Sequence, residues 1–155
     1  MDIRLKRAGI NDATLIWNMQ REAFQDLLFK YQDYDTNPGN EPVDKVIDRI
    51  NQEVTFFYFI FVDEKVVGAI RVVDTKENDT HKRISPLFIR KQYRNQGIAQ
   101  NAIKLAEEIH GKDHWRLDTI LEEKGNCYLY EKMGYHATGK IEKVNDKLTL
   151  VYYEK

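Results

Sequence analysis

A basic loop that leads into a helix-forming segment has the residue types of an anion-binding site. Residues 89–100 read IRKQYRNQGIAQ, so an apolar segment runs into a loop with three basic residues before an amphipathic segment begins at Gly97. The first N–H groups of a helix lack intrahelical partners, and the helix dipole makes that end positive. Gly97 leaves the backbone open to close approach, and Ala99 keeps the next turn small. We interpret the loop as a phosphate-binding helix start; a helix that simply begins at a glycine beside a solvated basic loop is the alternative.

Two other segments carry side chains suited to proton transfer. Asp118 lies in the otherwise apolar segment 115–121, where a carboxyl group needs a partner or acquires a raised pKa. Residues 125–135 read GNCYLYEKMGY and predict a short helix over 126–133 that carries Tyr130. The alternatives are a salt-bridged aspartate on a half-exposed strand and a tyrosine that packs its ring on a sheet.

The chain that must position these residues alternates between period-2 and period-3.6 hydrophobic patterns, which is typical of helices packed on a sheet. The order of the expected elements is β-α-α-β-β-β-α-β-α-β-β. The expected strands cover 3–7, 56–62, 66–73, a segment ending at 87–89, 115–121, 136–144 and 148–153. The first expected helix follows Asn11-Asp12, and the other three cover 43–50, 97–110 and 126–133. No internal repeat or linker divides the sequence, so we expect a single α/β (α+β) domain over residues 1–155.

Composition narrows the classes of function. Apolar residues make up 42% and charged residues 32% of the chain, which is typical of a globular protein. The 24 basic and 25 acidic residues give a net charge of −1, which argues against nucleic acid as the main partner. The single cysteine, Cys127, excludes an internal disulfide and a cysteine-based zinc cluster, and we expect no metal. The longest apolar run, 56–62, is too short to span a bilayer, and the first residues lack a secretory signal pattern. We therefore expect a cytoplasmic protein with no membrane partner.

Together, the two motifs resemble a known family. The string R-N-Q-G-I-A at a helix start, followed after a further strand by N-x-x-L-Y-E-K-M-G-Y, is similar to the GNAT superfamily of N-acetyltransferases. The order of elements agrees with that family over nearly the whole chain. The resemblance implies a mixed, centrally splayed β-sheet flanked by helices, with acetyl-CoA as the co-substrate that donates the acetyl group.

The resemblance also implies which residues contact coenzyme A. The backbone amides of the loop from Arg94 to Ala99 would hold the pyrophosphate, with Ala99 in place of the commoner second glycine of the family. The preceding strand would carry the pantetheine arm, and an asparagine expected before the short helix would touch the cofactor. The complete expected set is Leu87, Phe88, Ile89, Arg94, Asn95, Gln96, Gly97, Ile98, Ala99, Asn126 and Tyr130.

For the chemical step, the resemblance implies that Tyr130 is the general acid that protonates the leaving thiolate. This is consistent with acidity, because a phenol of pKa about 10 stays protonated at neutral pH and can donate to a thiolate of pKa about 8.5. Backbone N–H groups at the edge of 87–89 could stabilise the oxyanion if the sheet is open there. The family's usual carboxylate is missing from the preceding strand, which carries Ser85-Pro86. Asp118 is therefore our tentative base, with Glu122 and Glu123 as the next candidates.

The acceptor is expected to be a primary amine of a small molecule or peptide. In the family, the first two helices and their link cover the acceptor site. Here that region carries aromatic residues together with Asp33, Asp35 and Glu41, which would suit a cationic amine; a solvated acidic loop is the alternative. A non-catalytic acyl-CoA-binding sensor on the same fold is the rival function, favoured by the missing acid at Ser85. The hairpin formed by the last two strands could pair with a second copy, so a homodimer is possible.

Overall fold

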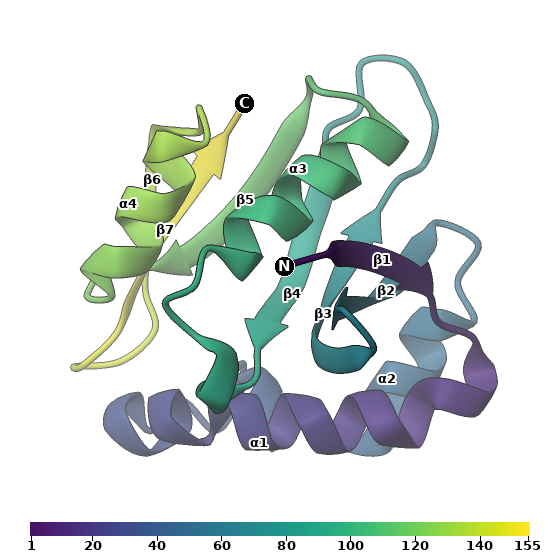
Figure 1. Ribbon diagram of the computed structural model, residues 1–155. Helices are drawn as coiled ribbons and strands as arrows, with labels where there is room; N and C mark the ends of the chain where they lie inside the picture. The colour runs from purple at the N-terminus through teal and green to yellow at the C-terminus, as the bar shows by residue number, and fades with distance from the viewer.

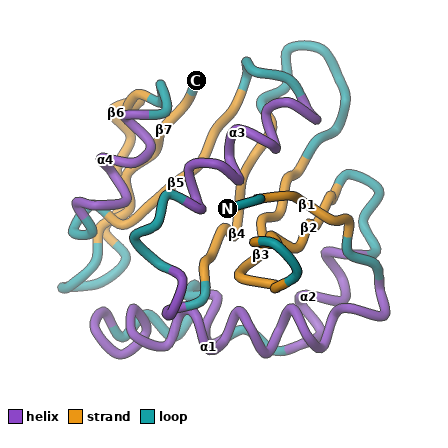
Figure 2. Tube along the Cα trace, in the orientation of Figure 1, coloured by secondary structure: helices purple, strands orange, loops and turns teal.

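A mixed sheet of seven strands forms the centre of the computed structural model, which describes residues 1–155. The strands lie in the order β1-β2-β3-β4-β5-β7-β6, and every neighbouring pair is antiparallel except β4 and β5. Figure 2 shows the strands as one layer with helices outside it. The strands are β1 (Ile3–Arg7), β2 (Thr55–Val62), β3 (Lys65–Val73), β4 (Lys82–Ile89), β5 (Trp115–Ile120), β6 (His136–Lys143) and β7 (Thr149–Glu154).

Helices cover both faces of the sheet and bury two separate cores. The helices are α1 (Ala13–Tyr31), α2 (Val43–Ile50), α3 (Ile98–His110) and α4 (Lys124–Lys132), joined by short 3-10 turns at Ile10–Asp12, Pro38–Asn40 and Lys91–Tyr93. Alternate side chains of β2 point to opposite faces, so Phe57 and Phe59 belong to the core that includes α1 and α2, whereas Tyr58 and Ile60 belong to the core on the face that carries α3 and α4. Burial on both faces explains the continuous apolar run of this strand. The expected order of elements and the mixed, splayed sheet are confirmed.

The splay lies between β4 and β5. Only two register pairs join these parallel strands, Lys82 with Trp115 and Arg83 with Arg116. Beyond them β4 stays paired with β3, while β5 turns toward β7, and Figure 1 shows the two arrowheads separating above α1. A register irregularity in the β3–β4 ladder accompanies the cis peptide bond between Ser85 and Pro86. The gap leaves one edge of the second half of β4 without a strand partner.

Two helix starts differ from the sequence-based expectation, and the bounds of several strands differ from it by one residue. Helix α4 begins at Lys124, so Asn126 lies inside its first turn and not before the helix, because the carbonyl of Glu123 already accepts the N–H groups of Asn126 and Cys127. Helix α3 begins at Ile98, with Gly97 as its N-cap residue in the left-handed conformation.

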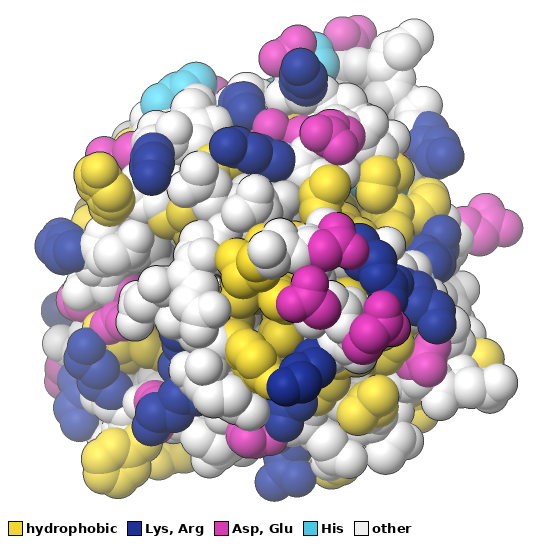
Figure 3. All heavy atoms as spheres, viewed as in Figure 1, with side chains coloured by type: hydrophobic (Ala, Val, Ile, Leu, Met, Phe, Trp, Pro, Cys, Tyr) yellow, Lys and Arg dark blue, Asp and Glu magenta, His cyan; other side chains and the backbone are white.

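The face that carries α3 is not dominated by charges of one sign. In Figure 3, basic and acidic side chains are interspersed over the face that carries α3. No helix in the chain combines the length and the apolar character needed to cross a bilayer.

Candidate active site

A cavity of about 650 Å³ lies between α1, the second half of β4 and the start of α3. Its lining contains ten of the eleven residues expected to contact coenzyme A: Leu87, Phe88, Ile89, Arg94, Asn95, Gly97, Ile98, Ala99, Asn126 and Tyr130. The exception is Gln96, whose side chain is exposed. We call this space the first cavity. Its remaining walls come from the middle and end of α1, from Tyr93 and Gln100, and from residues in and just before α4.

The loop into α3 presents a row of free backbone donors to the first cavity. The N–H groups of residues 95–100 form no hydrogen bond within the chain, and the first paired one is Asn101, which donates to the carbonyl of Gly97 at 3.2 Å. Asn95 and Gly97 have φ angles of +62° and +76°, so the backbone curls into a concave nest at the positive end of the helix. This arrangement fits a phosphate or pyrophosphate group.

The Arg94 side chain holds the walls of the first cavity together. Its Nε donates to the carbonyl of Ile89 at 3.0 Å, and one Nη donates to the carbonyl of Ala23 at 2.6 Å. Arg94 therefore ties α1 to the end of β4, and its charge remains beside the nest. Lys91 forms an exposed ion pair with Asp26 at 3.4 Å, which leaves the backbone groups as the principal anion-binding feature.

The backbone of β4 also points donors into the gap. Arg90 N–H bonds to the carbonyl of Val67 on β3 at 2.7 Å. Because hydrogen-bonding direction alternates along a strand, the N–H of Phe88 also faces β3, and those of Leu87 and Ile89 face the side on which β5 has diverged. These two donors lie on the open edge required for an oxyanion site.

A second cavity, of about 380 Å³, lies on the far side of the gap. It is bordered by the segment between α1 and α2, by β4 and β5, and by the β6–β7 hairpin. The residues that line both cavities are Phe24, Leu27, Leu87, Asn126 and Tyr130. The two spaces therefore meet at the open edge of β4, where one molecule entering from each side would bring its end to the same place.

Tyr130 stands at this junction with its hydroxyl unengaged. The half-buried side chain makes no hydrogen bond within the chain, and its ring packs edge-on against Tyr135 with centroids 6.0 Å apart. Burial, followed by the nearby charge of Asp118, raises the pKa of Tyr130 to about 12. The phenol is therefore protonated across the physiological pH range and is available as a donor.

Of the three carboxylates considered as a base, only Asp118 lines the second cavity. One of its oxygens lies 3.5 Å from a guanidinium nitrogen of Arg83, and the other makes no hydrogen bond. Glu123 lies in the first cavity and accepts from Lys30 at 2.8 Å and from the Tyr31 hydroxyl. Glu122 is exposed and accepts from the N–H of Thr149.

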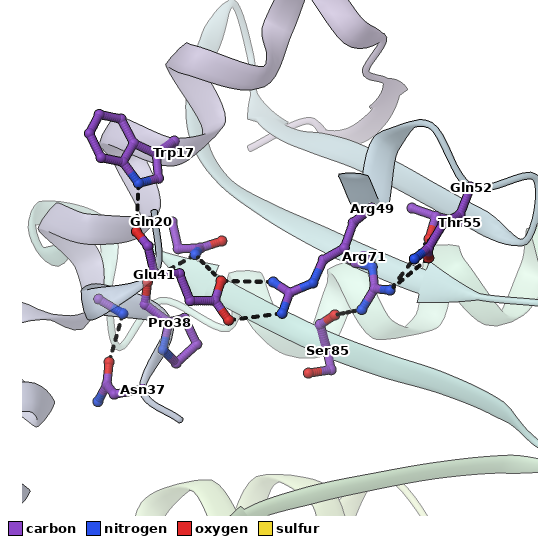
Figure 4. Close-up of polar contacts among 11 residues, drawn as sticks. Trp17, Gln20, Asn37, Pro38, Glu41, Arg49, Gln52, Thr55, Arg71 and Ser85 are labelled. Carbon is purple, nitrogen blue, oxygen red and sulfur yellow. Dashed lines mark hydrogen bonds and ion pairs between the residues drawn. The ribbon is translucent and has the colours of Figure 1, made fainter. Parts of the chain in front are cut away.

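The acidic residues expected near the acceptor are mostly committed to internal contacts. Asp33 accepts from the N–H and hydroxyl of Thr36. Glu41 accepts two bonds from Arg49, at 2.7 and 2.8 Å, and one from the amide of Gln20 at 2.9 Å (Figure 4). Asp35 is exposed and lies outside the lining of either cavity.

Sequence reasoning missed the arginines around the second cavity. Arg49 and Arg83 line it, and Arg71 lies behind them, where it donates to the carbonyl of Ser85 at 2.8 Å (Figure 4). The sequence feature that could have indicated them is Arg71 within the apolar segment VVGAIRVV, because a charged side chain in such a strand requires polar partners.

Comparisons with known proteins agree with this geometry. Residues 32–155 match the family model described as the acetyltransferase (GNAT) domain. No curated protein sequence matches the chain.

Solved structures share the fold at low sequence identity. The PaiA N-acetyltransferase of Thermoplasma acidophilum, in complex with coenzyme A, has a TM-score of 0.70 at 17% identity and covers 100% of both chains. The spermidine N-acetyltransferase of Vibrio cholerae, in complex with CoA and spermine, has a TM-score of 0.75 at 14% identity over 97% of this chain and 93% of its own. The Salmonella typhimurium acetyltransferase that modifies the N-terminal serine of ribosomal protein L7/L12 has a TM-score of 0.75 at 13% identity, over 97% and 92%.

Proposed function

The chain belongs to the GNAT acetyltransferase family, and we propose that it transfers the acetyl group of acetyl-CoA directly to a primary amine of a small molecule or peptide. The observation that carries this proposal is the meeting of two cavities at Tyr130 and Leu87, one of which contains the free amides of residues 95–100. Neighbours on this fold include a spermidine acetyltransferase and one that modifies a protein N-terminus, so both kinds of acceptor occur.

The first cavity presents donors that suit coenzyme A. The nest over residues 95–100 would hold the pyrophosphate, and the open edge of β4 would run beside the pantetheine arm, with Asn126 at the same wall. The support for this placement is that these N–H groups have no acceptor within the chain and that all of these residues except Gln96 line the cavity.

The junction residues have complementary roles in the chemical step. Asp118 would take a proton from the amine, whose nitrogen then forms a bond to the thioester carbon. The N–H of Leu87 would donate to the carbonyl oxygen as it gains negative charge. As the carbon–sulfur bond breaks, Tyr130 would give its proton to the departing sulfur, where negative charge develops, and its phenolate would regain a proton from the nitrogen, which must lose one to become a neutral amide.

A non-catalytic acyl-CoA sensor is the second candidate. The observation that favours it is the Ser85-Pro86 sequence on β4, which places no carboxylate on the strand beside the junction. Asp118 on the opposite strand compensates in the catalytic proposal. Turnover with any amine would therefore exclude the sensor.

The test begins with calorimetric titration of acetyl-CoA, desulfo-CoA and ATP into the purified protein. We expect selective binding of both CoA compounds and none of ATP. Thiol release is then measured with a panel of amines that includes polyamines, aminoglycosides, amino acids and short peptides. Absence of CoA binding would overturn the cofactor assignment, whereas binding without thiol release for any amine would favour the sensor.

A further inference from the structure

The second cavity has opposite charges on its two sides. The arginines Arg49, Arg71 and Arg83 come from α2, β3 and β4, on one side of the gap. The carboxylates that keep one oxygen free of hydrogen bonds are Asp118 on β5 and Glu142 on β6, on the other side. The arginines thus lie on the side of β3 and β4 and the two free carboxylate oxygens on the side of β5 and β6, with Arg83 and Asp118 in contact at 3.5 Å between them. Asp33 and Glu41 also line the cavity on the arginine side, but all their carboxylate oxygens already accept hydrogen bonds within the chain.

The positive side lacks a full set of counter-ions. Glu41 neutralises Arg49 through two short hydrogen bonds, and Asp118 approaches Arg83 through a single 3.5 Å contact. Arg71 is 8% exposed and has no carboxylate partner. It donates to the carbonyl of Ser85 and makes long contacts to Gln52 and Thr55, while its Nε has no partner (Figure 4).

The pKa of Arg71 agrees with this excess of positive charge. Its pKa falls to about 10, first because of burial and then because of the positive charges of Arg49 and Arg83. A buried cation that is repelled by two neighbouring cations is stabilised by any anion that binds close to them.

Arg83 is the arginine best placed to contact such an anion. It lines the second cavity, its side chain is 40% exposed, and only one of its nitrogens has a partner. Its remaining N–H groups can form the paired hydrogen bonds with which a guanidinium binds a carboxylate or phosphonate. Both terminal nitrogens of Arg49 donate to Glu41, so Arg49 contributes positive charge to the cavity but no pair of free N–H groups.

We propose that the acceptor carries an anionic group, in the first instance a carboxylate, in addition to its reactive amine, and that Arg83 binds this group. This inference rests on the proposed function and names the substrate class of the same site. The ammonium form of the amine matches the side of Asp118 and Glu142, and the anionic group matches the side of Arg83, Arg71 and Arg49. Arg83 is thus a specificity-determining residue, since it distinguishes amino acids or peptides with a free carboxylate from simple amines.

The test compares acceptors that differ only in charge. Amino acids from glycine to 6-aminohexanoate, and matching dipeptides, are each supplied as the carboxylate and as the primary amide, with 3-aminopropylphosphonate as a further anion. We expect kcat/KM to favour the best carboxylate over its amide by about 10- to 100-fold, as for a charge-assisted hydrogen bond. The comparison of free amino acids with dipeptides shows whether the site prefers the carboxylate of an amino acid or that of a peptide. The phosphonate shows whether the site requires a planar anion.

Variants assign the preference to Arg83. Arg83→Gln should bring the carboxylate-to-amide ratio close to 1, and Arg83→Lys should retain part of it. Arg116→Gln removes an equal charge from an exposed position beside Arg83 in the sheet register and should keep the wild-type ratio. If Arg83→Gln also disturbs Asp118, the rate with a carboxylate acceptor and the rate with its amide change alike. The carboxylate-to-amide ratio therefore reports only the contact between Arg83 and the anion.

A binding measurement separates this inference from the proposed function. The rise in Tm caused by each carboxylate and amide is recorded without acetyl-CoA, for the wild type and for Arg83→Gln. Stronger stabilisation by the carboxylates that is lost in Arg83→Gln supports the inference even if no amine is acetylated, in which case the proposed function fails alone. Equal stabilisation and equal kcat/KM for carboxylates and amides would overturn the inference while leaving the acetyltransferase intact.

Discussion

Arg83 on β4 and Arg116 on β5 form the last register pair between these two strands, and both cavities open beyond that pair. A sheet that remained paired past this point would use the N–H groups of Leu87 and Ile89 in its own ladder. Since the strands separate instead, those donors are available to a substrate, and two molecules can approach the same edge from opposite directions. The site is thus a consequence of where a ladder of hydrogen bonds ends.

Substitution of Gly97 should separate cofactor binding from folding. In Gly97→Val, a side chain would be introduced beside the free amides, at a φ of +76° that a β-branched residue rarely adopts. We expect the Kd for CoA to rise at least about tenfold because the backbone is blocked from a phosphate group. Calorimetric titration of CoA measures this change directly.

Gly139→Val is the matched control for that experiment. Gly139 has a φ of +93° and open space around it, but lies on β6, away from the loop before α3. Both variants should lose similar stability from backbone strain, and only Gly97→Val should lose affinity. Equal CoA affinity in the two variants would remove the pyrophosphate from this loop.

Replacement of Tyr130 tests the acid. Tyr130→Phe removes a hydroxyl that makes no internal hydrogen bond, so the fold should be preserved while kcat falls by about 10- to 1,000-fold. Tyr128→Phe alters an exposed tyrosine on the same helix and should leave kcat unchanged. Because the pKa of Tyr130 is raised to about 12, the wild-type rate should not decline through loss of this proton below about pH 10. Wild-type turnover in Tyr130→Phe would exclude the role.

Most of the fold could be predicted from local patterns. Hydrophobic periodicity is a property of neighbouring residues, which is why strand β1 and helix α2 have the expected bounds. The predicted start of α4 was two residues too late. The first hydrogen bonds of this helix use the carbonyl of Glu123, and glutamate is not a residue type that marks the N-cap of a helix.

Contacts between distant segments account for the rest. The gap between β4 and β5 depends on strands about thirty residues apart, and only the family resemblance implied it. The acidic residues near the acceptor were recognised by composition, whereas the partner that neutralises Glu41 comes from the next helix. A sequence shows how many charges a region carries but not which of them face each other.

The pairing of Glu41 with Arg49 gives a prediction for stability. Glu41→Gln leaves a largely buried guanidinium opposite a neutral amide and also weakens the contact with Gln20, which is fully buried. We expect the free energy of unfolding to fall by about 3 kcal/mol, as for a broken buried ion pair. Urea denaturation measures the loss. Asp48→Asn, an exposed change on α2 next to Arg49, should alter stability by less than about 0.5 kcal/mol; losses of equal size would mean that the pair contributes little.

A buried chain of hydrogen bonds at the other end of the sheet connects Tyr58, His110 and Asp74. The Tyr58 hydroxyl lies 2.8 Å from Nε2 of His110, and Nδ1 of His110 lies 2.7 Å from a carboxylate oxygen of Asp74. Burial lowers the pKa of His110 below 6.5, despite the opposing effect of Asp74. Burial by itself would raise the pKa of Asp74, but hydrogen bonds from His110 and from the N–H of Lys76 lower it overall.

Both shifts make the folded chain less stable in acid. Below pH 6.5 the unfolded chain binds a proton at His110 that the folded chain resists, so the free energy of unfolding falls as the pH decreases through that range. The depressed pKa of Asp74 adds a further loss nearer pH 4. Urea denaturation between pH 7.5 and 5.0 should show this slope, and His110→Gln should reduce it while lowering stability at pH 7.5 through the lost hydrogen bonds. His136→Gln changes an exposed histidine and should retain the wild-type slope; an unaltered slope in His110→Gln would show that other groups govern the acid sensitivity.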